Sequence, residues 1–210
     1  MARAVLKRLR AARDRLLLPE AASGLEQWQR VPLIAAVDRH IGSLDPPSRS
    51  AVEISGDAQA RKPWKRFVSL NYPDFDLCAP LGEHGTFDVV ICEQVIEHVP
   101  DPGAAVANLR DLCAPGGHVI VSTPFLIRVH ELYGMHDYWR FTPRGLRTLL
   151  EHAGLAVDTV GSWGNRRCVA GNLDHWPAYR RWHSLRDEPD LPVQVWAFAR
   201  RPRDLHSRPA

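Results

Sequence analysis

Cysteine is scarce in this sequence, with four residues among 210, and no two of them have a C-x-x-C spacing. Two of the four lie within expected buried elements, which predicts reduced thiols in the core of a cytoplasmic protein. The sequence also lacks any run near the ~20 apolar residues that a membrane-spanning helix needs. Its basic N-terminus has no continuous apolar core and no small-residue cleavage site, so no secretory signal is predicted.

A metal site is not predicted either. The cysteines are Cys78, Cys92, Cys113 and Cys168. A zinc site can be drawn by residue type alone from Cys92, His98, His130 and His136, but nothing in their spacing supports it.

Excess charge is small as well, because 27 Lys and Arg against 24 Asp and Glu leave a formal net charge of +3. That value does not by itself indicate nucleic-acid binding. The apolar fraction of 45% and the charged fraction of 24% are typical of globular proteins, and 210 residues suffice for one sizeable core. We therefore expect a basic helix over residues 1–18, a single domain over residues 19–201 and a disordered tail over residues 202–210.

The N-terminal segment has the pattern of an amphipathic helix, with Val5, Leu9, Ala12 and Leu16 on one stripe and arginines over much of the rest. The favoured interpretation is that this stripe packs on the domain. The alternative is a weak contact with an anionic membrane surface or a protein partner. A second helical pattern follows over residues 25–41 and is disturbed at Pro32.

The most informative pattern is a strand, helix and strand in about 36 residues. Residues 87–92 form an almost wholly apolar, β-branched run, which is typical of a strand covered on both faces. A helix opens at Asp101-Pro102 and stops at Pro115-Gly116-Gly117, where a second buried strand begins. Such a unit predicts a parallel sheet, in which ligands bind beyond the carboxyl ends of the strands. The polar residues expected at that end are Glu93, Gln94, Glu97 and His98.

This block resembles the class I S-adenosylmethionine-dependent methyltransferases of the type 11-like, small-molecule branch. The resemblance rests on Phe87-Asp88 at the strand start, Glu97-His98 after it, and Pro115-Gly116-Gly117 before the next strand. It implies a Rossmann-like α/β fold with a mostly parallel sheet, an antiparallel last strand and S-adenosylmethionine as the cofactor. Further strands are expected at residues 51–56, 66–70, 157–162 and 193–199.

The resemblance also implies a set of cofactor-binding residues. Glu53, Ser55 and Gly56 occupy the turn that usually reads E-x-G-x-G, so Ser55 stands where glycine is common. Asn71 stands where a carboxylate usually accepts the ribose hydroxyls, and Asp74 or Asp76 could serve instead, with Asp76 favoured on the adenine side. Glu93 and Gln94 complete the predicted cofactor set.

The sheet is expected to be shortened around its second and third strands. Only about sixteen residues separate Leu70 from Phe87, too few for the usual helix, strand and loops. The helix is therefore expected to be absent, with residues 76–78 forming either a vestigial strand or a loop beside the cofactor.

Residues 126–141 predict a lid over the acceptor pocket, because a long loop rich in His, Tyr, Trp and Arg makes a poor core. The predicted catalytic residues are His136 with Asp137, and His98; His130 is a further candidate base by type. Trp139 is expected to form a pocket wall. Thr142-Pro143 should start a helix that runs to Gly154.

The predicted function is direct SN2 methyl transfer from S-adenosylmethionine to a small molecule or a glycan or lipid precursor. One alternative, motivated by Ser55 and Asn71, is a catalytically inactive binding or scaffold protein of the same fold. A further alternative is an RNA methyltransferase, motivated by the basic first helix and by the tryptophans and arginines of residues 176–182. Those residues are interpreted instead as a hydrophobic cover with outward-pointing arginines, so nucleic acid is not an expected partner.

Overall fold

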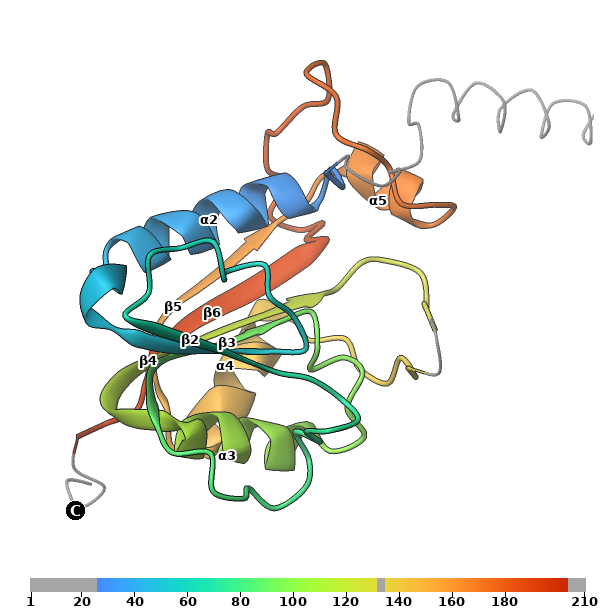
Figure 1. The fold of residues 1–210 in the computed structure, drawn as a ribbon. Coiled ribbons are helices and arrows are strands. Elements are labelled where there is room, and N and C mark those ends of the chain that lie inside the picture. Colours follow the sequence, from blue (N-terminus) through green and yellow to red (C-terminus); the bar gives the residue numbers. More distant parts are fainter. Residues whose placement is uncertain (1–25, 132–134, 204–210) are drawn as a thin grey trace, which may run out of the picture.

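The computed structural model describes residues 26–131 and 135–203, and it contains a six-stranded sheet in the order β2-β1-β3-β4-β6-β5 (Figure 1). The predicted helix over residues 1–18 and most of the predicted tail lie outside the described residues. No helix within the described residues is long and apolar enough to cross a membrane.

The strands confirm the predicted class of sheet. They are β1 (Ser50–Ile54), β2 (Arg66–Leu70), β3 (Phe87–Glu93), β4 (Cys113–Pro124), β5 (Ala156–Trp163) and β6 (Gln194–Arg200). Strands β1 to β4 pair in parallel, whereas β6 is antiparallel to both β4 and β5. The last strand therefore lies between β4 and β5 and runs opposite to both, as expected.

One face of the sheet is covered by α3 (Pro102–Leu112) and α4 (Pro143–His152). Both helices begin as their sequences indicate: the side chain of Asp101 accepts a hydrogen bond from Ala104 N, and that of Thr142 accepts one from Gly145 N. Each has proline at its first position, where no intrahelical donor is needed. Leucines of both helices, together with inward residues of β1, β3 and β4, form the core on this face.

The opposite face is covered by α2 (Arg30–Gly42), which lies above the sheet in Figure 1. Pro32 was expected to disturb this helix, but it lies in the first turn, where a missing backbone N–H costs nothing. Fully buried Trp28 precedes the helix and stacks on His183 with ring centroids 4.3 Å apart. A short 3-10 turn (Pro46–Ser48) then leads into β1.

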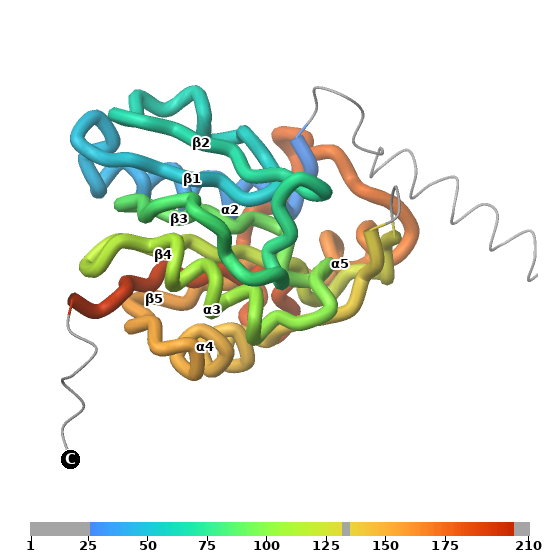
Figure 2. The backbone as a smooth tube through the Cα atoms, turned by 60° about the horizontal axis from the view of Figure 1, so that its bottom comes forward, coloured from blue at the N-terminus to red at the C-terminus, as the bar shows by residue number. Residues whose placement is uncertain are grey.

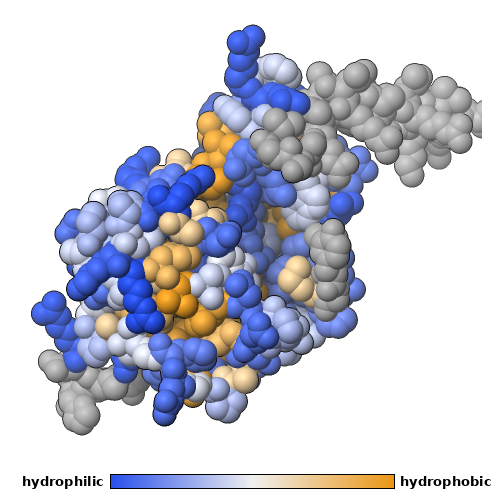
Figure 3. Space-filling view, viewed as in Figure 1, coloured by the Kyte–Doolittle hydropathy of each residue, from blue (hydrophilic) through white to orange (hydrophobic). Residues whose placement is uncertain are grey.

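The sheet is shortened at its β2 edge, as predicted. Residues 71–86 contain no helix or strand, and residues 76–78 form part of a turn rather than a vestigial strand. Strand β2 is consequently the edge strand on this side of the sheet, and its apolar side chains Val68 and Leu70 are only half-buried. Hydrophobic surface gathers below α2 on the face seen in Figure 3.

The carboxyl ends of the parallel strands meet at one end of the molecule. The loop after β4, described at residues 125–131 and 135–142 and called the lid loop below, extends from this end together with the short helix α5 (Arg166–Asn172), as Figure 2 shows. A backbone hydrogen bond joins the two, because Arg128 N donates to Asn172 O. The predicted site residues lie around this end.

Candidate cofactor and acceptor site

The turn after β1 keeps the shape of a glycine-rich turn despite its serine. Ser55 has a φ of 55°, in the left-handed region that favours glycine. A Cβ atom on Gly56 would lie 3.0 Å from Glu53 Oε1, so a side chain there would have to displace the carboxylate. The carboxylate is itself fixed, because its Oε2 accepts a hydrogen bond of 2.8 Å from Gln59 N. Burial raises the pKa of Glu53.

Gln59 connects this turn to the end of β3, a role that the sequence did not predict. Its Nε2 donates to Glu93 Oε1 at 2.9 Å, and its Oε1 is buried without a hydrogen-bond partner among the described residues. Glu53, Gln59 and Glu93 therefore form a polar chain across the ends of two adjacent strands. The unpaired amide oxygen leaves one buried acceptor available to a ligand.

Asn71 is linked to the same turn through β2. Its Nδ2 donates to Ser69 Oγ at 2.9 Å, and Ser69 Oγ in turn donates to Gly56 O. Asp76 behaves differently: its Oδ1 accepts from Cys78 N at 2.8 Å within its own turn. The structure therefore ties Asn71, rather than Asp76, to the first-strand turn.

Gln94 has a left-handed backbone, with a φ of 58°, at the point where the chain leaves β3. Its Nε2 donates to Ser122 Oγ at 3.2 Å and to Gln194 Oε1 at 2.8 Å. The side chain thus crosses the ends of β4 and β6. Ser122 and Gln194, both buried, were not predicted as members of the site.

Glu97 and His98 lie beyond β3, next to the lid loop. Glu97 is completely buried: its Oε2 lies 3.3 Å from Thr123 Oγ1, and its Oε1 has no hydrogen-bond partner among the described residues. Burial raises the pKa of Glu97 to about 8. Its backbone oxygen accepts hydrogen bonds from Tyr138 N at 2.8 Å and Trp139 N at 3.2 Å, which attach the lid loop to this point.

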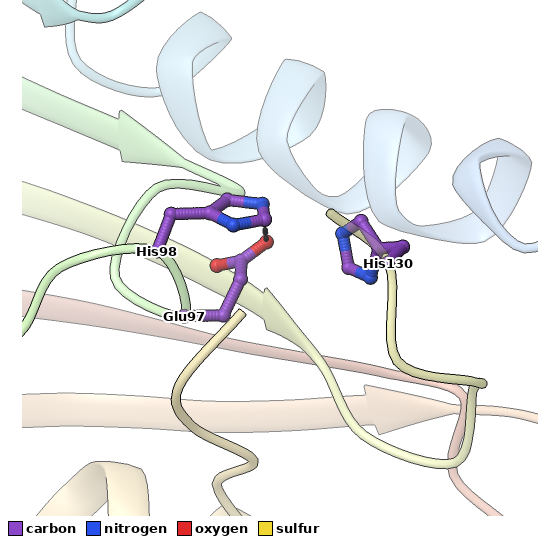
Figure 4. A group of neighbouring side chains, drawn as sticks. All are labelled: Glu97, His98 and His130. Carbon is purple, nitrogen blue, oxygen red and sulfur yellow. Dashed lines mark ion pairs between the residues drawn. The ribbon is translucent and has the colours of Figure 1, made fainter. Parts of the chain in front are cut away.

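His130 of the lid loop faces this pair (Figure 4). Its ring lies edge-on to that of His98, with centroids 4.9 Å apart, and edge-on to that of Trp176, with centroids 5.2 Å apart. His130 Nδ1 lies 3.1 Å from Asp137 Oδ2. Burial lowers the pKa of His130.

Asp137 is the anchor of the lid loop. Its side chain is fully buried, and its carboxylate accepts hydrogen bonds from the Arg140 guanidinium and from His130 N. Burial by itself would raise the pKa of Asp137, but these bonds outweigh it and lower that pKa.

His136 and Trp139 lie differently from what their residue types suggest. The His136 side chain is 64% exposed and lies 3.5 Å from Glu131, while its backbone oxygen contacts His98 Nδ1 at 2.7 Å. Trp139 Nε1 donates to Val99 O, and its ring stacks on Phe141. The structure thus places His130, not His136, beside Asp137, and the catalytic assignment of His136 stays a prediction.

The sequence predicts no metal site, and this stays a prediction, but one group of side chains has metal-binding atoms close together. Glu97, His98 and His130 each offer a ligand atom within 4.8 Å of the others. Of the zinc ligands weighed from the sequence, Cys92 is fully buried and burial strongly raises the pKa of its thiol, so it does not suit a thiolate ligand.

The strand order and the antiparallel β6 define a Rossmann-like methyltransferase fold. A family model described as a methyltransferase domain matches residues 43–160, which is more than half of the chain. The chain belongs to this family, whose methyl donor is S-adenosylmethionine. The left-handed Ser55, the space-restricted Gly56 and the unpaired Gln59 oxygen fit a cofactor held at the first-strand turn.

Curated relatives agree with this family. The chain is 36% identical over 106 residues to a ubiquinone biosynthesis O-methyltransferase of Chromobacterium violaceum, covering 42% of this chain and 44% of the relative. It is 34% identical over 128 residues to the protein of that name in Psychrobacter arcticus, covering 50% and 49%. The chain therefore spans about half the length of the curated relatives it matches.

Solved structures show the same fold at low identity. The 1,6-didemethyltoxoflavin-N1-methyltransferase of Burkholderia thailandensis, solved with S-adenosylhomocysteine, has a TM-score of 0.56 and 15% identity, covering 84% of this chain and 80% of that one. The [4+2]-cyclase SpnF has a TM-score of 0.54 and 12% identity, covering 84% of each chain. Since one similar fold is a methyltransferase and the other a cyclase, the fold alone does not establish the reaction.

Proposed function

We propose that this protein transfers the methyl group of S-adenosylmethionine to a hydroxyl oxygen. The acceptor is a small molecule or the precursor of a glycan or lipid. The observation that carries this proposal is the polar cluster of Glu97, His98 and His130, which lies beyond the end of β3 where the lid loop is bonded to the Glu97 backbone. Supporting it, the relatives at 34–36% identity are O-methyltransferases by name.

The bound cofactor supplies an electrophilic methyl on a sulfonium. In the transfer an O–C bond forms and the C–S bond breaks, giving S-adenosylhomocysteine, the methyl ether and a proton that passes to solvent. The first-strand turn and the Gln59–Glu93 chain hold the cofactor side. The lid loop, attached through the Glu97 backbone, orients the acceptor and excludes water, and such positioning is worth an effective molarity of about 10⁵–10⁸ M.

The RNA alternative has less support from the surface that motivated it. Trp182 is 62% exposed, but Trp176 packs on His130 and Tyr179 packs against the α2-side core. Two of the three aromatic rings thus cover the domain rather than offering a free stacking surface.

Cofactor binding and turnover test the proposal. Purified protein is titrated with S-adenosylmethionine in a calorimeter and then incubated with it and a panel of hydroxylated aromatic and polyprenylated compounds, with S-adenosylhomocysteine measured by mass spectrometry. We expect binding and transfer to at least one hydroxyl acceptor. Binding without any transfer would favour the inactive-binder alternative, and methylation of RNA in preference to the panel would favour the RNA alternative.

A glycine substitution tests where the cofactor binds. Gly56→Val should abolish binding, because its Cβ already meets the Glu53 carboxylate. Gly42→Val is the matched control, since a Cβ at Gly42 meets nothing within 4 Å. Unchanged affinity in Gly56→Val would remove the first-strand turn from the site.

A further inference from the structure

Three side chains with metal-binding atoms converge beyond β3. Glu97 and His98 come from the segment after the strand, and His130 comes from the lid loop (Figure 4). His98 Nε2 lies 3.7 Å from Glu97 Oε1, and ligand atoms of all three residues lie within 4.8 Å of one another. Bonds of about 2.0–2.2 Å to a tetrahedral zinc ion would separate two ligand atoms by roughly 3.4 Å, so small side-chain movements suffice to close the site.

The imidazole of His98 is oriented by a second contact, as metal-bound histidines usually are. His98 Nδ1 faces the His136 backbone oxygen at 2.7 Å, and a carbonyl can only accept a hydrogen bond. His130 Nδ1 lies 3.1 Å from the carboxylate of Asp137 but makes no hydrogen bond to any described residue. With the proton on Nδ1 of His98, the Nε2 lone pair of that ring is left free to coordinate, and His130 offers a ring nitrogen within reach of the same point.

Glu97 supplies an independent observation that points to a ligand. Its side chain is 1% exposed, and Oε1 has no hydrogen-bond partner among the described residues. A carboxylate oxygen buried in this way is costly unless a cation or proton meets it. The guanidinium of Arg140, in the same loop as His130, is occupied by Asp137.

We propose that Glu97, His98 and His130 bind one Zn²⁺ ion. Two imidazoles and one carboxylate suit zinc and similar transition metals, whereas Mg²⁺ and Ca²⁺ prefer oxygen ligands. Three protein ligands leave the fourth position open, which is the arrangement of catalytic rather than structural zinc. In a role that rests on the proposed function, the open position takes the hydroxyl oxygen of the methyl acceptor and holds it in place for the transfer.

The experiment titrates chelator-treated protein of residues 1–210 with ZnCl2 by calorimetry, without cofactor or acceptor. We expect one high-affinity ion per chain, and affinity at least a hundredfold lower in Glu97→Gln and His130→Ala. His152→Ala, on the exposed end of α4, is the matched control and should bind within twofold of the unaltered protein. Co²⁺ in place of Zn²⁺ should give the visible absorption bands of a four-coordinate site, and His130→Ala should abolish them.

Circular dichroism and thermal unfolding show whether each variant is folded. Because Glu97 is buried, Glu97→Gln is the variant more prone to unfold. His130 lies in a loop, so His130→Ala tests the site even if Glu97→Gln does not fold. No stoichiometric zinc, or equal affinity in His130→Ala and His152→Ala, would overturn the proposal. Hydroxyl methylation by protein that binds no zinc would refute the metal site and leave the proposed function standing. Zinc binding without methylation would support the metal site and refute the proposed function.

Discussion

Arg140→Met tests whether one ion pair holds the lid loop in place. The Arg140 guanidinium donates to both carboxylate oxygens of Asp137, and also to Trp139 O at 2.8 Å and Arg128 O at 3.1 Å. Methionine keeps much of the length and apolar stem of arginine but removes the charge and every one of these donors.

The magnitude follows from the burial of the partner. The Asp137 side chain is 0% exposed, so after the substitution its charge would be buried with only the His130 N hydrogen bond and the His130 ring beside it. Breaking a buried pair from one side costs 3–5 kcal/mol. Because the Arg140 side chain is 22% exposed, we take the lower end, about 3 kcal/mol.

Hydrogen exchange measured by mass spectrometry is the assay, because the loss should appear as local opening of the lid loop rather than as global unfolding. Amides of residues 126–131 and 135–141 should exchange about a hundredfold faster, since 1.4 kcal/mol corresponds to a factor of ten. Arg147→Met is the control, because its guanidinium also pairs with a carboxylate, that of Glu151, and donates to a backbone oxygen, Val157 O, but away from the lid loop. The lid-loop amides of this variant should therefore exchange at the rate of the unaltered protein.

A second substitution separates the ion pair from simple loss of packing. Asp137→Asn removes the buried charge, so the double variant Asp137→Asn/Arg140→Met should exchange more slowly than Arg140→Met alone. Two results would refute the reasoning. One is exchange of the lid-loop amides in Arg140→Met no faster than in Arg147→Met. The other is a double variant whose increase in exchange equals the sum of the increases, as free energies, in the two single variants.

Three more predictions concern single residues of the site and sheet. Asn71→Asp should tighten cofactor binding about fivefold, or roughly 1 kcal/mol by calorimetry, if it gains a charge-assisted bond to the ribose; weaker binding would exclude that role. Burial would raise the pKa of Asp88, but hydrogen bonds from Ser50 N and Oγ outweigh it and lower that pKa. The ionised Asp88 therefore stabilises the fold above the unfolded pKa of 3.8, and this stability is lost as pH falls through the lower folded pKa. Asp88→Asn should reduce the loss of unfolding free energy at acid pH, measured by urea unfolding, and an unchanged pH dependence would contradict the assignment. His136→Ala should lower turnover strongly with cofactor affinity within about threefold if His136 is the acceptor-side base, and full activity would eliminate it.

Much of the fold could be predicted from the sequence because its signals are local. The apolar run of β3 needs cover on both faces wherever it is placed, and Asp101 and Thr142 satisfy backbone donors only a few residues away. Such features depend on neighbours in the chain. They are therefore readable before the tertiary structure is known, as is the short edge that follows from the sixteen residues between β2 and β3.

The lid loop shows where this reasoning stops. Residue types suggested that His136 and Asp137 act together, yet adjacent side chains in a non-helical segment point in different directions. Asp137 instead meets His130, seven residues earlier, and Arg140, three residues later. That pairing depends on the path of the loop, which no local pattern specifies.

The sequence by itself determined the class of fold, the strand end at which the site lies and the presence of Glu97 and His98 there. Only the tertiary structure decided which groups contact the predicted residues at this strand end. Gln59 contacts Glu93, Gln194 contacts Gln94, and His130 lies beside Glu97 and His98. These partners lie between about thirty and one hundred residues apart in the chain. The parallel sheet brings them together because it stacks strand ends from distant segments at a single edge.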